Sequence, residues 1–254
     1  MSDPVVQQPA VEATPGLSQG QRITNMFTAP SKTFEDIKNG HRSWWLPFII
    51  YAVLGFAFYG VVSSKVGMRQ VSENQVKLSP KAEEQMAQLP PEQREQRMKI
   101  SVAITQGIFM AGPVFLLLMG SVISLVLLGT INFVFGGKAK FASVLAVWMY
   151  AMMPSCIKTI LGIVVLYAGT APDSFNIKNF APTNLGAFMN PMETNPGLYS
   201  LLSSIDFVTI WTLALVGIGV AIVAGTKRSS GYIASFGWWA LIVIVGAGFA
   251  AAFS

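Results

Sequence analysis

Cysteine and histidine are almost absent from this chain, since each occurs once, as Cys156 and His41. A single cysteine excludes an internal disulfide and any CxxC zinc or redox pair. A single histidine excludes a metal site built from several imidazoles. No HExxH zinc motif and no Walker-type phosphate loop occurs either. We therefore predict no catalytic residue, no metal and no cofactor, and expect a protein that is not an enzyme.

Charge is also scarce. Only 11% of the 254 residues are charged and 52% are hydrophobic, whereas soluble domains carry about 25% charged residues. The mean hydropathy is +0.53. These values predict an integral membrane protein in contact with lipid. The net charge of +5 could suggest nucleic acid, but the basic residues flank apolar segments, so membrane orientation explains them and no nucleic-acid partner is expected.

Apolar segments long enough to cross a bilayer occur five times, which predicts an all-α, polytopic bundle of five transmembrane helices. Pro113 and Pro154 are expected to kink the second and third helices. Four tryptophans are expected to anchor span ends at the membrane interface: Trp44, Trp45, Trp238 and Trp239. The predicted spans cover residues 44–62, 100–135, 141–168, 200–224 and 232–253.

The region before the first span divides into two parts. Residues 1–20 are polar and lack the apolar core of a signal peptide, so we expect a disordered tail. Residues 21–43 predict an amphipathic interfacial helix, with a break near Pro30. Packing on the end of the bundle is an equally good interpretation. Apolar residues recur every three or four positions (Ile23, Met26, Phe27, Phe34, Ile37), opposite a polar face (Arg22, Lys32, Glu35, Asp36, Lys38). Residues 44–254 would form the five-span membrane domain.

The loops predict how the bundle is oriented. The short loops 136–140 and 225–231 contain lysine or arginine but no acid, and the N-terminal flank is also basic. The positive-inside rule places these segments in the cytoplasm and the C-terminus outside. Loops 63–99 and 171–199 must then both lie outside. The first of these conflicts with the rule, because it carries seven basic residues among five acidic ones.

Small residues repeat every four positions in the fourth span, at Gly217, Ala221 and Gly225. Such a stripe lets helix backbones approach closely. We expect it to serve packing within one chain, and a homo-oligomer is the alternative.

Lys158 and Asp206 are charged residues in apolar surroundings. Lys158 lies nine residues before Tyr167, and Asp206 lies six residues after Ser200, which places them about 13 Å and about 9 Å from the same side. An ion pair between the third and fourth spans is therefore feasible. However, residues 207–224 can cross the bilayer alone, in which case Asp206 would cap a helix at the outer boundary and Lys158 would snorkel outward. We favour a structural role, with a small transporter or channel as the alternative.

Three segments carry recognisable patterns: NMFTAPSKTFEDIKNGHRSWWLPFII (25–50), with an F-x-x-P-x-x-x-F pattern, AVWMYAMMP (146–154) and SSIDFVTIWTLALVGIGVAIVAGTKRSSGY (203–232). Together they resemble the bacterial Yip-domain family. In the third segment, Asp206 and Trp211 match the aspartate and the nearby tryptophan of the family's pattern.

The resemblance implies five membrane helices in the bacterial cytoplasmic (inner) membrane, with the N-terminus in the cytoplasm and the C-terminus outside. Eukaryotic members bind Rab-type GTPases, and some bacterial members resemble accessory partners of ABC-type exporters. We therefore expect a non-enzymatic protein that organises or assists other membrane components. Its partners would be membrane proteins, such as transporter subunits.

Overall fold

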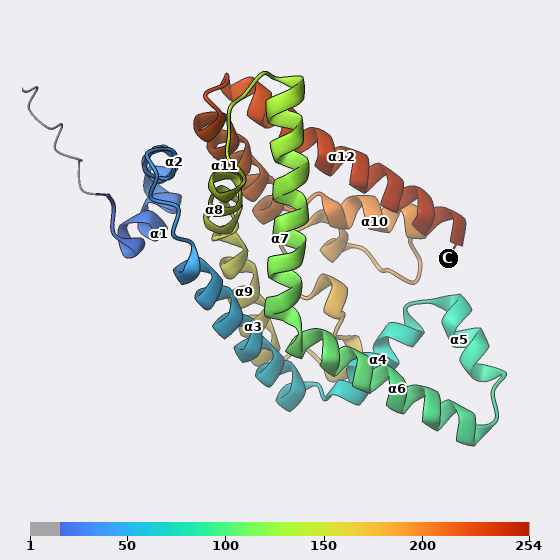
Figure 1. The fold of residues 1–254 in the computed structure, drawn as a ribbon. Coiled ribbons are helices and arrows are strands. Elements are labelled where there is room, and N and C mark those ends of the chain that lie inside the picture. The colour runs from blue at the N-terminus through green and yellow to red at the C-terminus, as the bar shows by residue number, and fades with distance from the viewer. Residues whose placement is uncertain (1–15, 254) are drawn as a thin grey trace, which may run out of the picture.

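The computed structural model describes residues 16–253, so most of the predicted tail, 1–15, lies outside the described residues. Within 16–253 the chain is helical and has no strand, apart from one isolated β-bridge between Asn184 and Asp206. Figure 1 shows long helices packed as a bundle, with an N-terminal helix pair beside it and a helical arm projecting away from it.

Five helical segments are long and apolar enough to cross a membrane, which confirms the predicted fold class. The fourth segment begins at residue 207 rather than 200, because α10 (Pro196–Ser204) ends before it. The five segments are α3 (Trp45–Lys65), α7 (Gly112–Gly129) continued by the π-turn η1 (Thr130–Val134), α8 (Phe141–Ala151) with α9 (Pro154–Tyr167), α11 (Phe207–Ala224) and α12 (Arg228–Phe253).

Both interior prolines coincide with interruptions of helix. α6 (Pro91–Met110) ends just before α7 begins, and Pro113 is the second residue of α7. α8 ends at Ala151 and α9 begins at Pro154. Proline suits the first turn of a helix because an N–H there has no acceptor within the helix, so no hydrogen bond is lost when proline lacks it.

The N-terminal pair, α1 (Gln19–Thr28) and α2 (Pro30–Lys38), packs against the bundle. Met26, Phe34 and Ile37 are at most 1% exposed. Phe34 lies close to Gly219 of α11 and packs with Val147 of α8, and in Figure 1 the pair lies beside α8 and α11. Burial of these apolar side chains fixes the pair to the bundle.

One end of the bundle gathers the N-terminal flank and the two short basic loops. Arg42 Nε donates to Ser143 Oγ at 2.8 Å. Arg228 Nη2 donates to Ser31 Oγ at 3.3 Å, and the backbone N–H of Lys138 donates to the carbonyl of Ala224 at 3.0 Å. We call this end the basic-loop end.

The two long loops lie together at the opposite end. The first contains α4 (Met68–Lys77) and α5 (Pro80–Ala87), and the second contains η2 (Pro172–Ser174), η3 (Ile177–Asn179) and η4 (Leu185–Phe188). Asn74 of α4 donates to the carbonyls of Pro172 and Phe175 at 2.8 and 2.9 Å. The loops 63–99 and 171–199 therefore lie at the same end of the bundle, although the first loop carries many basic residues.

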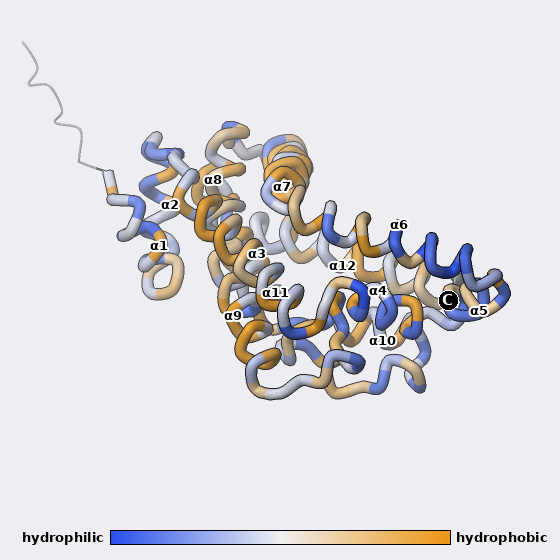
Figure 2. The backbone as a smooth tube through the Cα atoms, turned by 90° about the horizontal axis from the view of Figure 1, so that it is seen from below, coloured by the Kyte–Doolittle hydropathy of each residue, from blue (hydrophilic) through white to orange (hydrophobic). Residues whose placement is uncertain are grey.

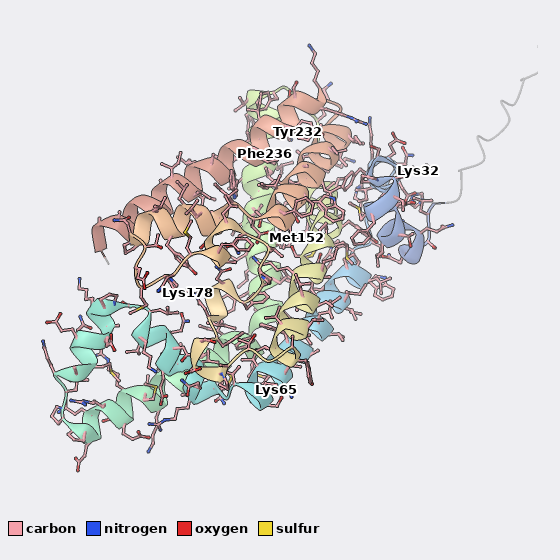
Figure 3. The ribbon with its side chains drawn as sticks, turned by 180° about the vertical axis from the view of Figure 1, so that it is seen from behind. Lys32, Lys65, Met152, Lys178, Tyr232 and Phe236 are labelled. Carbon is pink, nitrogen blue, oxygen red and sulfur yellow. The ribbon has the colours of Figure 1, made fainter. Side chains whose placement is uncertain are left out.

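The first and third spans also end together. Lys65, the last residue of α3, lies with its Nζ 4.5 Å from the ring centroid of Tyr167, the last residue of α9. Figure 3 shows Lys32 and Lys65 toward opposite ends of the molecule, with Met152 between them. Figure 2 shows the spans as mainly hydrophobic and the arm of α5 and early α6 as largely hydrophilic.

Candidate functional site

Asp206 immediately precedes the fourth span. It lies between α10 and α11, and its Oδ1 accepts a hydrogen bond from the backbone N–H of Thr209 at 2.9 Å. Its backbone is extended, as is usual for an N-cap residue. The residue is only 1% exposed. A carboxylate at this position satisfies a free helix N–H and lies at the positive end of the helix dipole.

The structure brings Asp206 and Lys158 together. Lys158 Nζ of α9 donates to Asp206 Oδ2 at 2.8 Å. Thr183 Oγ1 donates to the same oxygen at 2.6 Å. The Lys158 side chain is 25% exposed and also lies over the ring of Phe180, with Nζ 5.8 Å from the centroid. Asp206 therefore forms the ion pair and caps the helix at the same time, although the sequence had suggested these two roles as alternatives.

Backbone hydrogen bonds reinforce the position of Thr183. The N–H of Phe207 donates to the Thr183 carbonyl at 2.9 Å, and the N–H of Leu185 donates to the Ile205 carbonyl at 3.3 Å. These bonds form the isolated bridge between Asn184 and Asp206. One carboxylate thus joins the third span, the fourth span and the loop above them.

The surroundings of Asp206 favour its ionised form. Burial raises the pKa of this carboxyl, but hydrogen bonds from Lys158, Thr183 and the Thr209 N–H outweigh burial and hold the pKa below its ordinary value. Both carboxylate oxygens are occupied by donors. Neither Lys158 nor Asp206 lines the cavity within the loop 171–199. The arrangement can hold helices in register.

A second buried ion pair, Arg22 with Asp36, joins α1 to α2. Arg22 Nε donates to Asp36 Oδ2 at 2.7 Å, and Arg22 Nη1 donates to the Ser43 carbonyl at 3.2 Å. The two side chains are 5% and 9% exposed. The periodicity placed both residues on the polar face, yet they are buried. A helix-period pattern reports a residue's face but cannot show that two such faces pack together.

The spacing GLSQG at residues 16–20 matches a serine-nucleophile motif, GxSxG. Ser18 instead caps α1, where its Oγ accepts from the Gln21 N–H at 3.2 Å. No hydrogen bond joins Ser18 to His41 in the described part of the chain. The match is therefore explained by helix capping.

The small residues of the fourth span differ in role. A Cβ on Gly217 would lie 2.7 Å from Tyr232, and a Cβ on Gly231 would lie 2.0 Å from the Gly217 carbonyl and 3.0 Å from Ala221. Gly217 and Ala221 therefore pack against α12. Gly225 does not pack: it ends α11 with φ +69°, and a Cβ there would meet nothing within 4 Å. It stops the helix, because glycine adopts this conformation without strain.

The four predicted tryptophan anchors occupy different surroundings. Trp44 precedes α3 and packs edge-on against Phe48, whereas Trp45 is 53% exposed. Trp238 Nε1 donates to Thr130 Oγ1 at 2.9 Å, near the end of the second span. Trp239 packs edge-on against Phe236.

No group of three or more His, Cys, Asp or Glu side chains suited to a metal ion occurs among residues 16–253. Cys156 is a buried free thiol in the third span. Arg22 and His41 both contact the carboxylate of Asp36. This cluster contains a single acid, so it is not one of the groups that could hold a metal ion.

Comparison with known proteins agrees with the fold. A family model described as the Yip1 domain matches residues 24–250, which is most of the chain. No curated protein and no solved structure matches the chain significantly.

Proposed function

Because the chain belongs to the Yip1 domain family, we propose that this integral membrane protein is non-enzymatic and organises or assists other membrane components. The proposed partner is a membrane-protein complex such as an ABC-type exporter. The proposed location is the bacterial cytoplasmic membrane, with the N-terminus in the cytoplasm and the C-terminus outside.

The arm formed by α4, α5 and the first half of α6 carries this proposal. α5 buries none of its residues, and Figure 1 draws it at the outer end of the arm, below the C-terminal end of α12. Arg69 ties the arm internally, through Glu73 at 2.9 Å and both carboxylate oxygens of Glu95 at 2.9 and 2.8 Å. A folded polar arm whose outer helix, α5, buries none of its residues is suited to contacting another protein.

The distribution of charge supports the proposed orientation. The basic-loop end combines Lys32, Lys38, Lys138, Lys140 and Lys227, all exposed. The long-loop end mixes basic and acidic residues, including five glutamates between 63 and 99. Lysine and arginine close to span ends favour the cytoplasmic side, so the basic-loop end is assigned to the cytoplasm.

The alternative of a small transporter or channel would use Lys158 and Asp206. The geometry supports it less well, because Asp206 is almost fully buried and receives three donors. A carrier residue must release its partners during transport, whereas this pair also holds the loop through Thr183. A structural tie accounts for every contact that the pair makes.

Affinity purification in mild detergent with identification of co-purifying proteins tests the proposal. The wild-type chain is expected to recover a membrane-protein complex. Reversing the charge of two exposed α5 residues, by Glu83→Lys and Glu84→Lys, should reduce that recovery. Asp173→Lys, a charge reversal of the same sign at an exposed acid of the loop 171–199, is the control and should leave it unchanged.

The opposite result is equally clear. If the chain purifies alone and reconstituted vesicles show a flux that Asp206→Asn abolishes, the transporter alternative is correct and the proposed role fails.

A further inference from the structure

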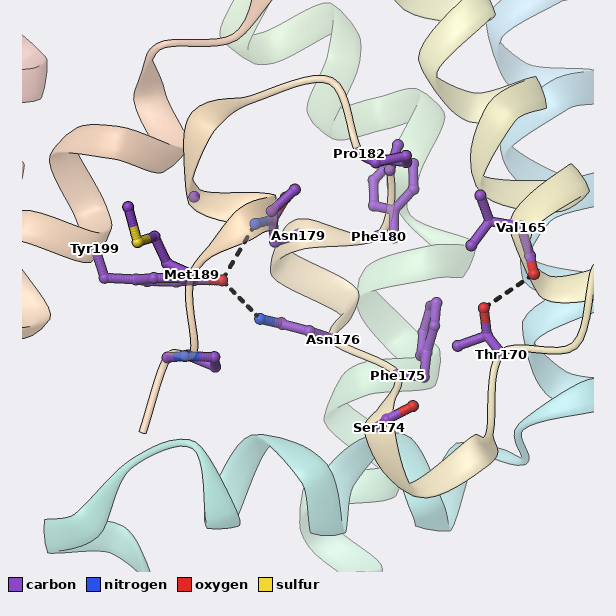
Figure 4. A pocket seen from close by; sticks show the side chains of 14 residues that line it. Val165, Thr170, Ser174, Phe175, Asn176, Asn179, Phe180, Pro182, Met189 and Tyr199 are labelled. Atoms are coloured by element: carbon purple, nitrogen blue, oxygen red, sulfur yellow. Dashed lines mark hydrogen bonds between the residues drawn. The ribbon is translucent and has the colours of Figure 1, made fainter. Parts of the chain in front are cut away.

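A cavity of about 260 Å³ lies within the loop 171–199 and beside the end of α9. Figure 4 shows it between Val165, Phe175 and Phe180 on one side and Tyr199 with two asparagines on the other. Most of its wall is apolar, and no acidic or basic side chain lines it. An ionic ligand would therefore find no opposite charge, and the cavity suits an uncharged one.

The polar end of the cavity is centred on the Tyr199 hydroxyl. Asn176 Nδ2 donates to this oxygen at 3.4 Å and Asn179 Nδ2 donates at 3.1 Å. A phenol oxygen can accept such bonds while donating one of its own. Figure 4 draws both bonds converging on the oxygen.

Backbone N–H groups fix the orientation of both amides. The N–H of Lys178 donates to Asn176 Oδ1 at 3.0 Å, so the nitrogen of Asn176 faces Tyr199. The N–H of Ala187 donates to Asn184 Oδ1 at 3.0 Å. Asn184 Nδ2 then donates to Asn179 Oδ1 at 2.6 Å, which turns the nitrogen of Asn179 toward Tyr199. The Tyr199 hydroxyl oxygen thus accepts two hydrogen bonds, one from each asparagine.

The Tyr199 hydrogen remains without an acceptor among the described residues. The other hydroxyls of the lining are used internally, since Thr170 Oγ1 donates to the Val165 carbonyl and Ser174 Oγ donates to the Ala171 carbonyl, each at 2.9 Å. The cavity therefore combines an apolar wall with one available hydroxyl donor. It is complementary to an apolar ligand that carries an uncharged acceptor oxygen.

The position of the cavity along the membrane normal narrows the class of ligand further. Val165 lies two residues before the end of the third span at Tyr167, so the cavity sits near the boundary of the hydrocarbon layer. The ester carbonyls of acyl lipids lie at this boundary. We propose that the cavity binds an acyl ester, with the chain against the aromatic wall and the carbonyl accepting from Tyr199. This site goes beyond the proposed partner role and does not depend on it.

Native mass spectrometry of the detergent-purified full chain tests the site with three probes. Dipalmitoylglycerol represents a bilayer lipid, methyl palmitate represents a detached acyl ester, and hexadecane has no acceptor. The wild-type chain should retain an ester at least about fivefold better than hexadecane, the value of one hydrogen bond. Binding of dipalmitoylglycerol alone would identify the bilayer as the source, and binding of methyl palmitate would add detached esters.

Two variants and one control separate the site from general lipid adhesion. Tyr199→Phe keeps the ring and should lower ester retention about fivefold without changing hexadecane. Val165→Phe should fill the cavity and lower retention of all three probes. Tyr167→Phe removes an exposed hydroxyl outside the cavity and should change nothing. Equal retention of esters and hexadecane by the wild-type chain, or unchanged ester retention in either folded variant, overturns the proposal.

Discussion

Lys158 of α9 donates to the carboxylate of Asp206 at 2.8 Å, across 48 residues of sequence, while the same carboxylate caps α11 through the Thr209 N–H. One side chain therefore both caps the fourth span and links it to the third. Thr183 adds the loop to this connection. Removing the charge should disturb all three segments together.

Asp206→Asn is expected to destabilise the protein by about 3 kcal/mol, because Lys158 loses its ionic partner in a largely buried site. The readout is thermal unfolding in mild detergent. Asp173→Asn, at an exposed acid in the loop 171–199, is the control and should change stability by less than about 0.5 kcal/mol. Adding Lys158→Met to Asp206→Asn should recover part of the loss. Strictly additive effects of the two substitutions would contradict a direct pair.

The contribution of Asp206 to the stability of the fold should be lost at low pH and not at high pH. Its folded-state pKa is lowered, because hydrogen bonds from Lys158, Thr183 and Thr209 outweigh burial. The stabilisation is therefore present above the unfolded-state pKa of about 3.9 and is lost as the pH falls through the folded-state pKa. The difference in Tm between the wild type and Asp206→Asn should be constant from about pH 5 to 8 and shrink below about pH 4. A difference that changes between pH 6 and 8 would argue against an ionised Asp206.

Arg22→Met should loosen the contact between α1 and α2. It leaves the buried Asp36 carboxylate without its guanidinium, at a cost of about 3 kcal/mol. Hydrogen exchange of residues 18–43 should accelerate more than that of α11. Lys32→Met changes an exposed cation of the same pair and should leave exchange unaltered. Equal protection in both variants would show that apolar packing alone holds α1 and α2.

Gly231→Ala should push α12 away from α11. A Cβ at this position would lie 2.0 Å from the Gly217 carbonyl, and a backbone atom cannot move aside as a side chain can. The expected cost is about 3 kcal/mol, measured by thermal unfolding. Gly237→Ala lies in the same helix, where a Cβ meets nothing within 4 Å, so it should be neutral or stabilise by up to about 1 kcal/mol. Similar losses in both variants would mean that the contact with Gly217 does not explain the effect, because helix propensity favours alanine at both positions.

The fold was predictable because its signals are local. Each span is an uninterrupted apolar segment, and each proline interruption follows from a missing N–H. The start of α11 was only partly predictable. Residues 200–206 are apolar enough to extend the span, but the carboxylate of Asp206 competes as a helix cap, and the cap determines the boundary.

Two residues of the candidate site could be predicted from the sequence. Lys158 and Asp206 stand out as charges among apolar residues, and their depths can be compared by counting. Thr183 could not be identified in this way, because threonine in a loop rich in asparagine and proline is unremarkable. The burial of Arg22 with Asp36 was hidden for a similar reason, since each residue alone fits a polar helix face.

The sequence by itself determined that this is a membrane protein with five apolar spans, because hydrophobic length and scarce charge act locally along the chain. Tertiary structure alone decided which polar groups meet: Arg22 with Asp36, Thr183 with Asp206, and Asn179 with Tyr199. These contacts join residues that no periodic pattern connects. The low dielectric of the interior makes each of them matter, because an unpaired polar group there carries a high cost.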